Sequence, residues 1–312
     1  MLGVTMGDSS GVGPEILLKA LKSGLLDPQT LIFGDRGALE FCNRELGYGV
    51  TLSQLNLRDQ GALQAGQITP GKLNALSGAA ARDYVVEATH AALRGEIEAI
   101  VTLPINKEAT QLSDPGFTGH TELIGSICKA PDVTIMLVSD KLIVTHVSTH
   151  CSLRTAIDRV KTDRVFRIIE LTCQAVARLR SSPKIAVAGL NPHAGENGLF
   201  GSEDIEEILP AIRRAQVMGY PVEGPHAPDT VFYMAVHRKA FDAVVCMYHD
   251  QGHIAAKILD FESAVNVTLG LPIIRTSVDH GTAFDIAYQG IASDRSFERA
   301  LHLAKAMVQQ AG

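Results

Sequence analysis

Short runs of apolar and β-branched residues alternate along this chain with longer segments in which apolar residues recur at helical spacing. The short runs predict buried strands at 2–6, 31–34, 99–103, 133–138, 142–147, 184–190, 243–247 and 265–269. The longer segments predict helices near 14–23, 80–94, 160–180, 203–218, 229–240 and 295–310. Strands and helices that alternate in this way are typical of an α/β protein whose largely parallel sheet is covered by helices.

One pair of neighbouring strands departs from that alternation. Residues 133–139 and 141–147 are separated only by a polar turn around Asp140, and this spacing predicts an antiparallel hairpin. A hairpin inside an α/β chain indicates a second lobe with mixed strands. The length of 312 residues allows one large domain or two lobes that share a cleft.

Composition and charge narrow the possible classes of function. With 46% hydrophobic and 20% charged residues the chain can bury a large core, and its net charge of −6 argues against a nucleic-acid-binding protein. No signal peptide is visible, and no apolar stretch reaches the ~20 residues that a membrane helix needs. The five cysteines are scattered, which is typical of reduced thiols, so we expect a cytoplasmic protein without membrane partners.

Three histidines stand just after predicted strands. His150, His193 and His249 follow the strands at 142–147, 184–190 and 243–247. In open α/β sheets, ligands bind outside the carboxyl ends of the strands. A single histidine in such a place more often caps a strand, but three together favour a shared metal site. Three imidazole ligands with open positions are typical of a catalytic metal ion.

Other polar residues are placed where they could hold an anion. His120 and Thr121 stand where a helix can begin, which favours carboxylate or phosphate binding, although such a pair is often only a surface cap. Lys257, Asn266 and Arg275 offer an ammonium, an amide and a guanidinium group for the same purpose. Arg275 lies in an apolar run, where an unpaired charge would be costly, so simple surface charge explains it poorly.

Two glycine-containing loops are candidates for nucleotide binding. Residues 7–15 join a strand to a helix that starts near Pro14, but they contain neither a dinucleotide fingerprint nor a P-loop. Alone, they fit an ordinary turn equally well. Residues 277–287 predict a loop that opens a helix with Asp285 in its first turn, which suits either a nucleotide site or a capped helix start.

Several of these segments carry a family resemblance. The blocks LNPHAGENG, MYHDQG and NVTLGLPIIRTSVDHGTAFDIA resemble the 4-hydroxythreonine-4-phosphate dehydrogenase family of pyridoxal phosphate biosynthesis. GDSSGVGPE and HGTAFDIAYQGIASD are similar to loops of isocitrate and isopropylmalate dehydrogenases. The resemblance implies a two-lobed α/β fold with a central cleft rather than a Rossmann domain. It places an NAD-binding lobe at 1–120 and 255–312, and a metal-binding and dimerisation lobe at 121–254.

The resemblance also implies roles for the candidate residues. His150, His193 and His249 would bind one divalent metal ion (Zn, Mg or Co), with one ligand supplied across a homodimer interface. A small phosphorylated substrate would be held by His120, Thr121, Lys257, Asn266 and Arg275. The cofactor NAD would face Gly281, Thr282, Ala283 and Asp285.

The implied reaction is oxidation of a phosphorylated hydroxy acid followed by decarboxylation. The metal would lower the pKa of the substrate hydroxyl and stabilise the enolate charge. Candidates for the catalytic base are Asp229, Asp250 and Lys257, in no fixed order.

The identity of the substrate stays open at this stage. 4-Hydroxythreonine 4-phosphate is the first expectation. Ser9, Ser10 and His253 depart from the usual biosynthetic pattern, in which Leu follows the HDQG motif, and this favours a catabolic branch that acts on D-threonate or D-erythronate 4-phosphate. Outside the dehydrogenases, a metal-dependent hydrolase or phosphatase that uses the three histidines is the main alternative.

Overall fold

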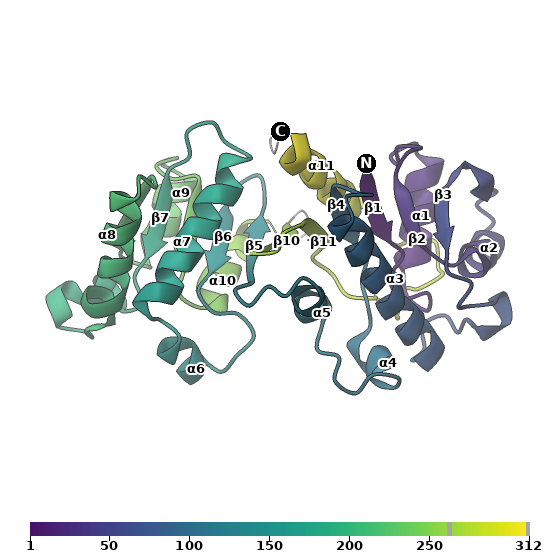
Figure 1. The fold of residues 1–312 in the computed structure, drawn as a ribbon, viewed down its shortest axis with the longest axis horizontal. Helices are drawn as coiled ribbons and strands as arrows, with labels where there is room; N and C mark the ends of the chain where they lie inside the picture. Colours follow the sequence, from purple (N-terminus) through teal and green to yellow (C-terminus); the bar gives the residue numbers. More distant parts are fainter. Residues whose placement is uncertain (261–263, 310–312) are drawn as a thin grey trace. The chain divides into compact units, whose positions relative to one another are not determined.

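The computed structural model describes residues 1–260 and 264–309. The chain forms two compact units, one comprising Met1–Pro131 with Leu271–Val308 and the other Asp132–Gly270. In Figure 1 the first unit contains the purple, blue and yellow ends of the chain, and the second contains its teal and green middle. Each unit combines strands and helices.

The sheet of the first unit is parallel throughout, in the strand order β3-β2-β1-β4-β11. Its strands are β1 (Leu2–Thr5), β2 (Leu31–Gly34), β3 (Asn56–Asp59), β4 (Ala99–Thr102) and β11 (Ile274–Val278). Its helices are α1 (Gly13–Lys22), α2 (Arg36–Glu45), α3 (Ala75–Leu93), α4 (Lys107–Gln111), α5 (His120–Ile127) and α11 (Arg295–Gln309). Helix α3 packs across β1, β2 and β4, and every residue of these three strands is buried.

The sheet of the second unit is mixed, in the order β10-β5-β6-β9-β7-β8. Its strands are β5 (Thr134–Val138), β6 (Ile143–His146), β7 (Ile185–Ala188), β8 (Val222–His226), β9 (Ala243–Cys246) and β10 (Val265–Leu269). Strands β5 and β6 pair antiparallel, which confirms the predicted hairpin, and β6, β9, β7 and β8 run parallel. Its helices are α6 (Leu153–Asp158), α7 (Thr162–Ala177), α8 (Leu209–Val217), α9 (Val231–Val236) and α10 (His249–Leu259), with a π-helical turn at Asp204–Ile208 ahead of α8.

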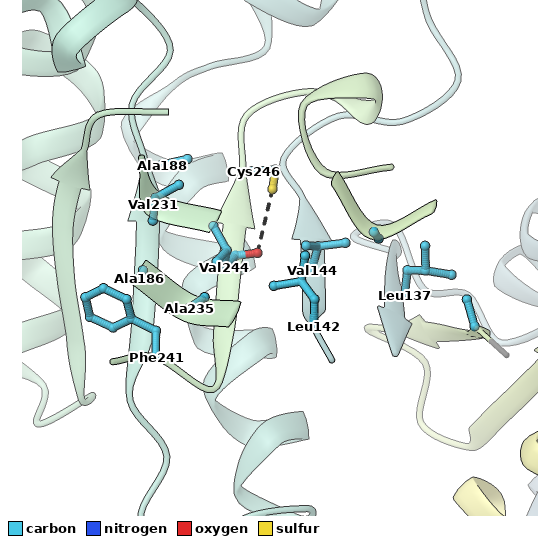
Figure 2. Close-up of a cluster of buried hydrophobic side chains, with 12 residues drawn as sticks. Leu137, Leu142, Val144, Ala186, Ala188, Val231, Ala235, Phe241, Val244 and Cys246 are labelled. Carbon is cyan, nitrogen blue, oxygen red and sulfur yellow. Dashed lines mark hydrogen bonds between the residues drawn. The ribbon is translucent and has the colours of Figure 1, made fainter. Parts of the chain in front are cut away.

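Adjacent residues of β6 show which helices cover each face of this sheet. The Thr145 hydroxyl lies 2.8 Å from that of Thr172 on α7, whereas the neighbouring His146 contacts α10. Because successive side chains of a strand point to opposite faces, α7 and α10 cover opposite faces of the sheet. Figure 2 shows the core on the α10 face, where apolar side chains of β5, β6, β7 and β9 pack with α9.

Most of the predicted strands and helices are present in the structure. Physical reasons explain why strands β3 and β8 were not predicted. Strands 31–34 and 265–269 have the predicted bounds, and the other predicted strands shift by one or two residues. Strand β3 was missed because its residues are half exposed at a sheet edge, and β8 because it contains the Gly224–Pro225 pair, which only an edge strand tolerates.

Two expectations differ from the structure. Residues 284–288 form a turn rather than a helix, because Ala283 and Tyr288 adopt left-handed φ values of 46° and 60° that interrupt a helix. The units divide after Pro131 and Gly270 rather than after residues 120 and 254. Helix α5 packs against α3 and so stays with the first unit, while β10 pairs with β5 and stays with the second.

No helix in residues 1–260 and 264–309 combines the length and the apolar character needed to cross a membrane. Cys42, Cys128, Cys151, Cys173 and Cys246 are all free thiols.

Candidate active site

The three candidate metal ligands lie at one edge of the second unit's sheet. His150 follows β6, His193 follows β7, and His249 begins α10 directly after β9. Strands β6, β9 and β7 are parallel neighbours, so their carboxyl ends meet at the same edge. The structure therefore gives these histidines the strand-end positions that the sequence predicted.

His249 is oriented as a metal ligand would be. Its Nδ1 lies 2.7 Å from Oδ1 of Asp250. A carboxylate only accepts hydrogen bonds, so Nδ1 carries a proton and Nε2 is the ring nitrogen left for coordination. The ring of His150 lies 5.6 Å from that of His249, measured between centroids. Two of the three candidate ligands are thus brought together.

His193 lies in a strained turn. His193, Ala194, Glu196 and Asn197 all have left-handed φ values, between 40° and 56°. Each such residue costs about 1–2 kcal/mol, and strain of this kind is concentrated at functional sites. Buried Asp204 holds the start of the turn, because its carboxylate accepts hydrogen bonds from the backbone N–H groups preceding His193, at 2.8 and 3.1 Å.

One chain does not bring all three histidines together. Within the described residues, no three His, Cys, Asp or Glu side chains form a group that could hold a metal ion. The ring of His193 instead lies 6.1 Å from that of Phe200. A complete three-histidine site needs a further movement or a second copy of the chain.

The first unit contains a cationic cluster suited to an anion. Arg275 on β11 is buried, and its Nη2 donates to Oγ1 of Thr102 at 2.7 Å. Burial lowers the pKa of Arg275 to about 10, which leaves the guanidinium charged at neutral pH. Burial lowers the pKa of His120 well below its usual value, and the charges of Arg275 and Lys107 lower it further. The His120 Nε2 atom is buried, and no described residue gives it a hydrogen bond.

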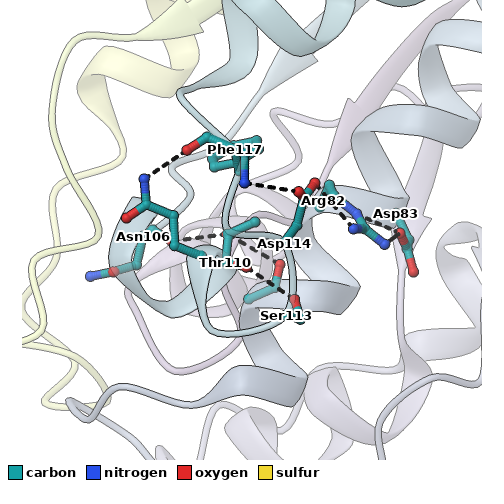
Figure 3. Close-up of polar contacts among 10 residues, drawn as sticks. Arg82, Asp83, Asn106, Thr110, Ser113, Asp114 and Phe117 are labelled. Carbon is teal, nitrogen blue, oxygen red and sulfur yellow. Dashed lines mark hydrogen bonds and ion pairs between the residues drawn. The ribbon is translucent and has the colours of Figure 1, made fainter.

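Lys107 was missed by sequence reasoning. It stands shortly after β4, at the start of α4, so its position after a strand's carboxyl end was the available signal. The segment that carries it is held by a polar network (Figure 3). Arg82 on α3 forms an ion pair with Asp114 at 3.3 Å, and the Gln111 amide donates to the carbonyl of Phe117 at 2.7 Å. These contacts position the segment 107–119 that leads to His120.

The remaining candidates for substrate binding and catalysis lie in the second unit. Asn266 on β10 has a buried Oδ1 atom to which no described residue donates a hydrogen bond. Lys257 lies on α10, about two turns after His249. Asp229 is exposed in the turn that precedes α9.

The two glycine-containing loops of the first unit pack against each other. The Val12 N–H donates to the Thr282 carbonyl at 3.0 Å, and the Tyr288 hydroxyl donates to the Ser9 carbonyl at 2.7 Å. A Cβ on Gly11 would lie 2.7 Å from the Thr282 oxygen, so this close approach requires glycine. A Cβ on Gly281 would meet no atom within 4 Å, so the backbone there faces open space.

Comparison with known proteins places the chain in a family. The family profile described as "Pyridoxal phosphate biosynthetic protein PdxA" matches residues 27–304. The chain belongs to the PdxA family. A PdxA-family relative from Cupriavidus necator, named D-threonate 4-phosphate dehydrogenase, is 44% identical over 317 residues, which cover 96% of this chain and 95% of the relative. The crystal structure of 4-hydroxythreonine-4-phosphate dehydrogenase from Klebsiella pneumoniae matches with a TM-score of 0.86 at 40% identity, covering 99% of each chain.

The PdxA relatives are named as dehydrogenases, so this chain is an oxidoreductase, and the family indicates a nicotinamide cofactor. A β-decarboxylating dehydrogenase from Thermococcus kodakarensis shares the fold, with a TM-score of 0.55 at 13% identity over 100% of this chain and 83% of the other. This likeness confirms the expected dehydrogenase fold in place of a Rossmann domain.

Proposed function

We propose that the chain catalyses NAD-dependent and divalent-metal-dependent oxidation and decarboxylation of a small phosphorylated hydroxy acid. The observation that carries the proposal is the His249–Asp250 pair beside His150 at the carboxyl edge of a sheet, in a chain of the PdxA family. A histidine oriented by a carboxylate next to a second histidine is a common arrangement at metal centres.

The donor set fits a divalent cation. His150, His193 and His249 supply imidazole nitrogens, which suit Zn or Co better than Mg. When bound, the cation supplies Lewis acidity, which lowers the pKa of the substrate hydroxyl and stabilises the enolate charge left by decarboxylation. Asp250 holds the Nδ1 proton of His249, so it serves this ligand rather than acting as the base. Asp229 and Lys257 remain the candidates for accepting the hydroxyl proton.

The substrate's negative charges are assigned to the remaining polar residues. In the first unit, buried Arg275, with Lys107, His120 and Thr121 nearby in the same unit, supports binding of a phosphate or carboxylate group. The groups assigned to the substrate in the second unit are Lys257 and Asn266. The buried acceptor atom of Asn266 suits a substrate hydroxyl or amino group.

The cofactor is assigned to the loop at Gly281, Thr282, Ala283 and Asp285. Support comes from the open space beside Gly281 and from the packing of this loop on residues 7–12. Held by this loop, NAD would supply the hydride acceptor for the carbon that bears the hydroxyl, and the base of this chain would take the hydroxyl proton. The β-keto acid so formed then loses CO₂ to give a three-carbon keto phosphate.

Two substrates fit this scheme. 4-Hydroxythreonine 4-phosphate carries an amino group on the carbon next to the carboxylate, and D-threonate 4-phosphate carries a hydroxyl there. The name of the Cupriavidus necator relative favours D-threonate 4-phosphate, as do Ser9, Ser10 and His253. 4-Hydroxythreonine 4-phosphate is favoured by the name of the Klebsiella pneumoniae structure.

A homodimer with a shared site completes the proposal. Leu199, Phe200 and Ile205, around the His193 turn, are 72%, 46% and 44% exposed, and Ile254 and Ile258 on α10 are 58% and 80% exposed. Several large apolar side chains exposed on one surface are typical of an interaction site. We assign this surface to a second copy of the chain, whose His193 would join His150 and His249.

The deciding experiment is an assay of the purified protein with NAD and Zn, Co or Mg. Each phosphorylated acid is tested separately, with absorbance at 340 nm and released CO₂ as readouts. We expect NADH from at least one acid, and none from its dephosphorylated form. Phosphate release without NAD would instead support a metal-dependent phosphatase. If neither acid yields NADH in folded, metal-loaded protein, the proposed function is wrong.

A further inference from the structure

Two histidines outside the proposed ligand set form a buried pair on the α10 face of the second unit. His146 at the end of β6 is fully buried, and its Nδ1 lies 3.2 Å from the carbonyl oxygen of Ile135. Its Nε2 lies 3.1 Å from Nδ1 of His253 on α10. The His253 side chain is buried as well.

The direction of these hydrogen bonds fixes both tautomers. A carbonyl only accepts, so Nδ1 of His146 carries the proton and its Nε2 is an acceptor. Nδ1 of His253 must then be the donor to His146, and the same N–H also approaches the carbonyl of His249 at 3.3 Å. Two acceptors, Nε2 of His146 and the carbonyl oxygen of His249, thus set the orientation of the His253 ring.

His253 in turn contacts the proposed metal ligand. The rings of His249 and His253, one helical turn apart on α10, are stacked with centroids 3.8 Å apart and an interplanar angle of 10°. The His249 side chain is 33% exposed, so its own burial does not fix its rotamer. The stack restrains the plane of the His249 ring, while Asp250 restrains rotation within that plane.

Gly252 provides the room for the pair. A Cβ at this position would lie 2.6 Å from Nε2 of His146 and 2.8 Å from Sγ of Cys246. Any larger residue would therefore force the His146 ring away from His253.

We propose that His253 is a positioning residue, which is held by His146 and which orients His249 for metal binding through ring stacking. The inference rests on the proposed function, because it assigns His249 to the metal. Partners of this kind that orient a ligand typically change metal affinity by 10–100-fold. His253 stands where the biosynthetic pattern has Leu, and a leucine could not form this stack.

The test measures binding of Co²⁺ alone to the purified full-length protein, by calorimetry and visible absorption. We expect His253→Leu to raise the Kd for Co²⁺ about 10-fold or more and to alter the Co²⁺ spectrum. His253→Phe keeps a flat ring for stacking but cannot donate to His146, so it should recover most of the affinity. Thermal melting of each variant shows whether it is folded. If His253→Leu is unfolded, His253→Asn, which keeps polar groups but cannot stack, takes its place and should bind weakly.

The possible failures are distinguishable. If His249→Ala abolishes Co²⁺ binding while folded His253→Leu or His253→Asn binds with the Kd of the parent, this inference is overturned and the metal site stands. If His253→Phe binds as weakly as His253→Leu, stacking is not the cause and the inference is also overturned. If the parent protein binds no Co²⁺, the proposed metal site fails, and this inference with it.

Discussion

Asp8 is a buried carboxylic acid in the loop that follows β1, and its ionisation should affect stability. Burial raises its pKa from 3.8 to about 6, although backbone N–H groups of Ser10 and Asn106 partly oppose the shift. Between these pH values the folded state binds more protons than the unfolded state, so this group's contribution to stability falls as pH rises. A shift of this size corresponds to about 3 kcal/mol when Asp8 is fully ionised.

We therefore predict that Asp8→Asn becomes more stabilising, relative to the parent, as pH rises. Urea unfolding at pH 4.5 and pH 7.5 should show a change of about 2 kcal/mol in the difference between the two proteins. Comparing the same two proteins at both pH values cancels any pH-independent effect of the amide. A difference that stays constant with pH would contradict the shift.

Two glycines in the paired loops offer a matched test of the cofactor site. Gly281→Ala adds a methyl group to open space, so it should leave the melting temperature unchanged but raise the KM for NAD. Gly11→Ala places its Cβ 2.7 Å from the Thr282 oxygen and should destabilise the fold by about 1–3 kcal/mol. Thermal melts and NAD titrations of both variants provide the comparison. If Gly281→Ala leaves the KM unchanged, the cofactor lies elsewhere.

Single-residue predictions from sequence succeeded where position along a strand carried the signal. His150, His193 and His249 could be grouped because each follows a strand, and parallel strands share a carboxyl edge. Lys107 follows β4 in the same way but was overlooked because a lysine on a short helix resembles ordinary surface charge. The contact of His253 with His146 could not be predicted, since it depends on how closely α10 approaches β6 at Gly252.

At the scale of elements, the turn at 192–198 is the least regular segment of the proposed site. Consecutive left-handed residues store strain there, and the carboxylate of Asp204 compensates by accepting hydrogen bonds from the N–H groups of Leu190 and Asn191. Asp204→Ala would leave two N–H groups without this acceptor, so we predict a loss of about 2–4 kcal/mol of stability. It should also weaken Co²⁺ binding, because His193 would lose its fixed position.

Asp204→Asn is the control for this prediction. Its amide retains one acceptor oxygen, so its stability and Co²⁺ affinity should lie between those of Asp204→Ala and the parent. Urea unfolding and calorimetry measure the two quantities. Parent-like Co²⁺ affinity in folded Asp204→Ala would show that the turn does not position a metal ligand.

Regular elements with continuous apolar patterns were predictable, and irregular ones were not. The strands at 31–34 and 265–269 are short apolar runs buried within their sheets, whereas β8 is interrupted by a Gly–Pro pair. Helix α10 was missed because HDQGHIAAKIL combines two histidines and a glycine near its start, and these residues serve contacts rather than helix propensity. The left-handed turn at His193 has no signature in residue type apart from its glycines.

At the scale of the whole molecule, hydrophobic alternation predicted the α/β class, and the hairpin predicted a second unit with a mixed sheet. The positions of the unit boundaries could not be predicted, because they depend on long-range pairing. Strand β10 belongs to the second unit only because it pairs with β5, more than 100 residues earlier in the chain.

The proposed sharing of the metal site makes a prediction about mixed dimers. His193→Ala and His249→Ala should each be inactive alone, since each removes one ligand from every site. In a heterodimer of the two variants, one site receives both substitutions and the other receives neither. The intact site combines His249 of the first variant with His193 of the second. Co-expression with two different tags, followed by sequential purification, yields this heterodimer, which should show about half of the parent's activity per dimer.

The outcome depends on where the ligands come from, because sites built within one chain would leave both halves of the heterodimer defective. A dimer in which both differently tagged chains carry His193→Ala is the control, and it should be inactive under either arrangement.

The exposed apolar residues around His193 and on α10 give the second copy its surface, so Ile258→Asp should lower the dimer fraction in light scattering. It should reduce Co²⁺ affinity in parallel, because dissociation removes the third ligand from each site. Full Co²⁺ affinity in a monomeric Ile258→Asp variant, together with an inactive heterodimer, would place all the ligands in one chain.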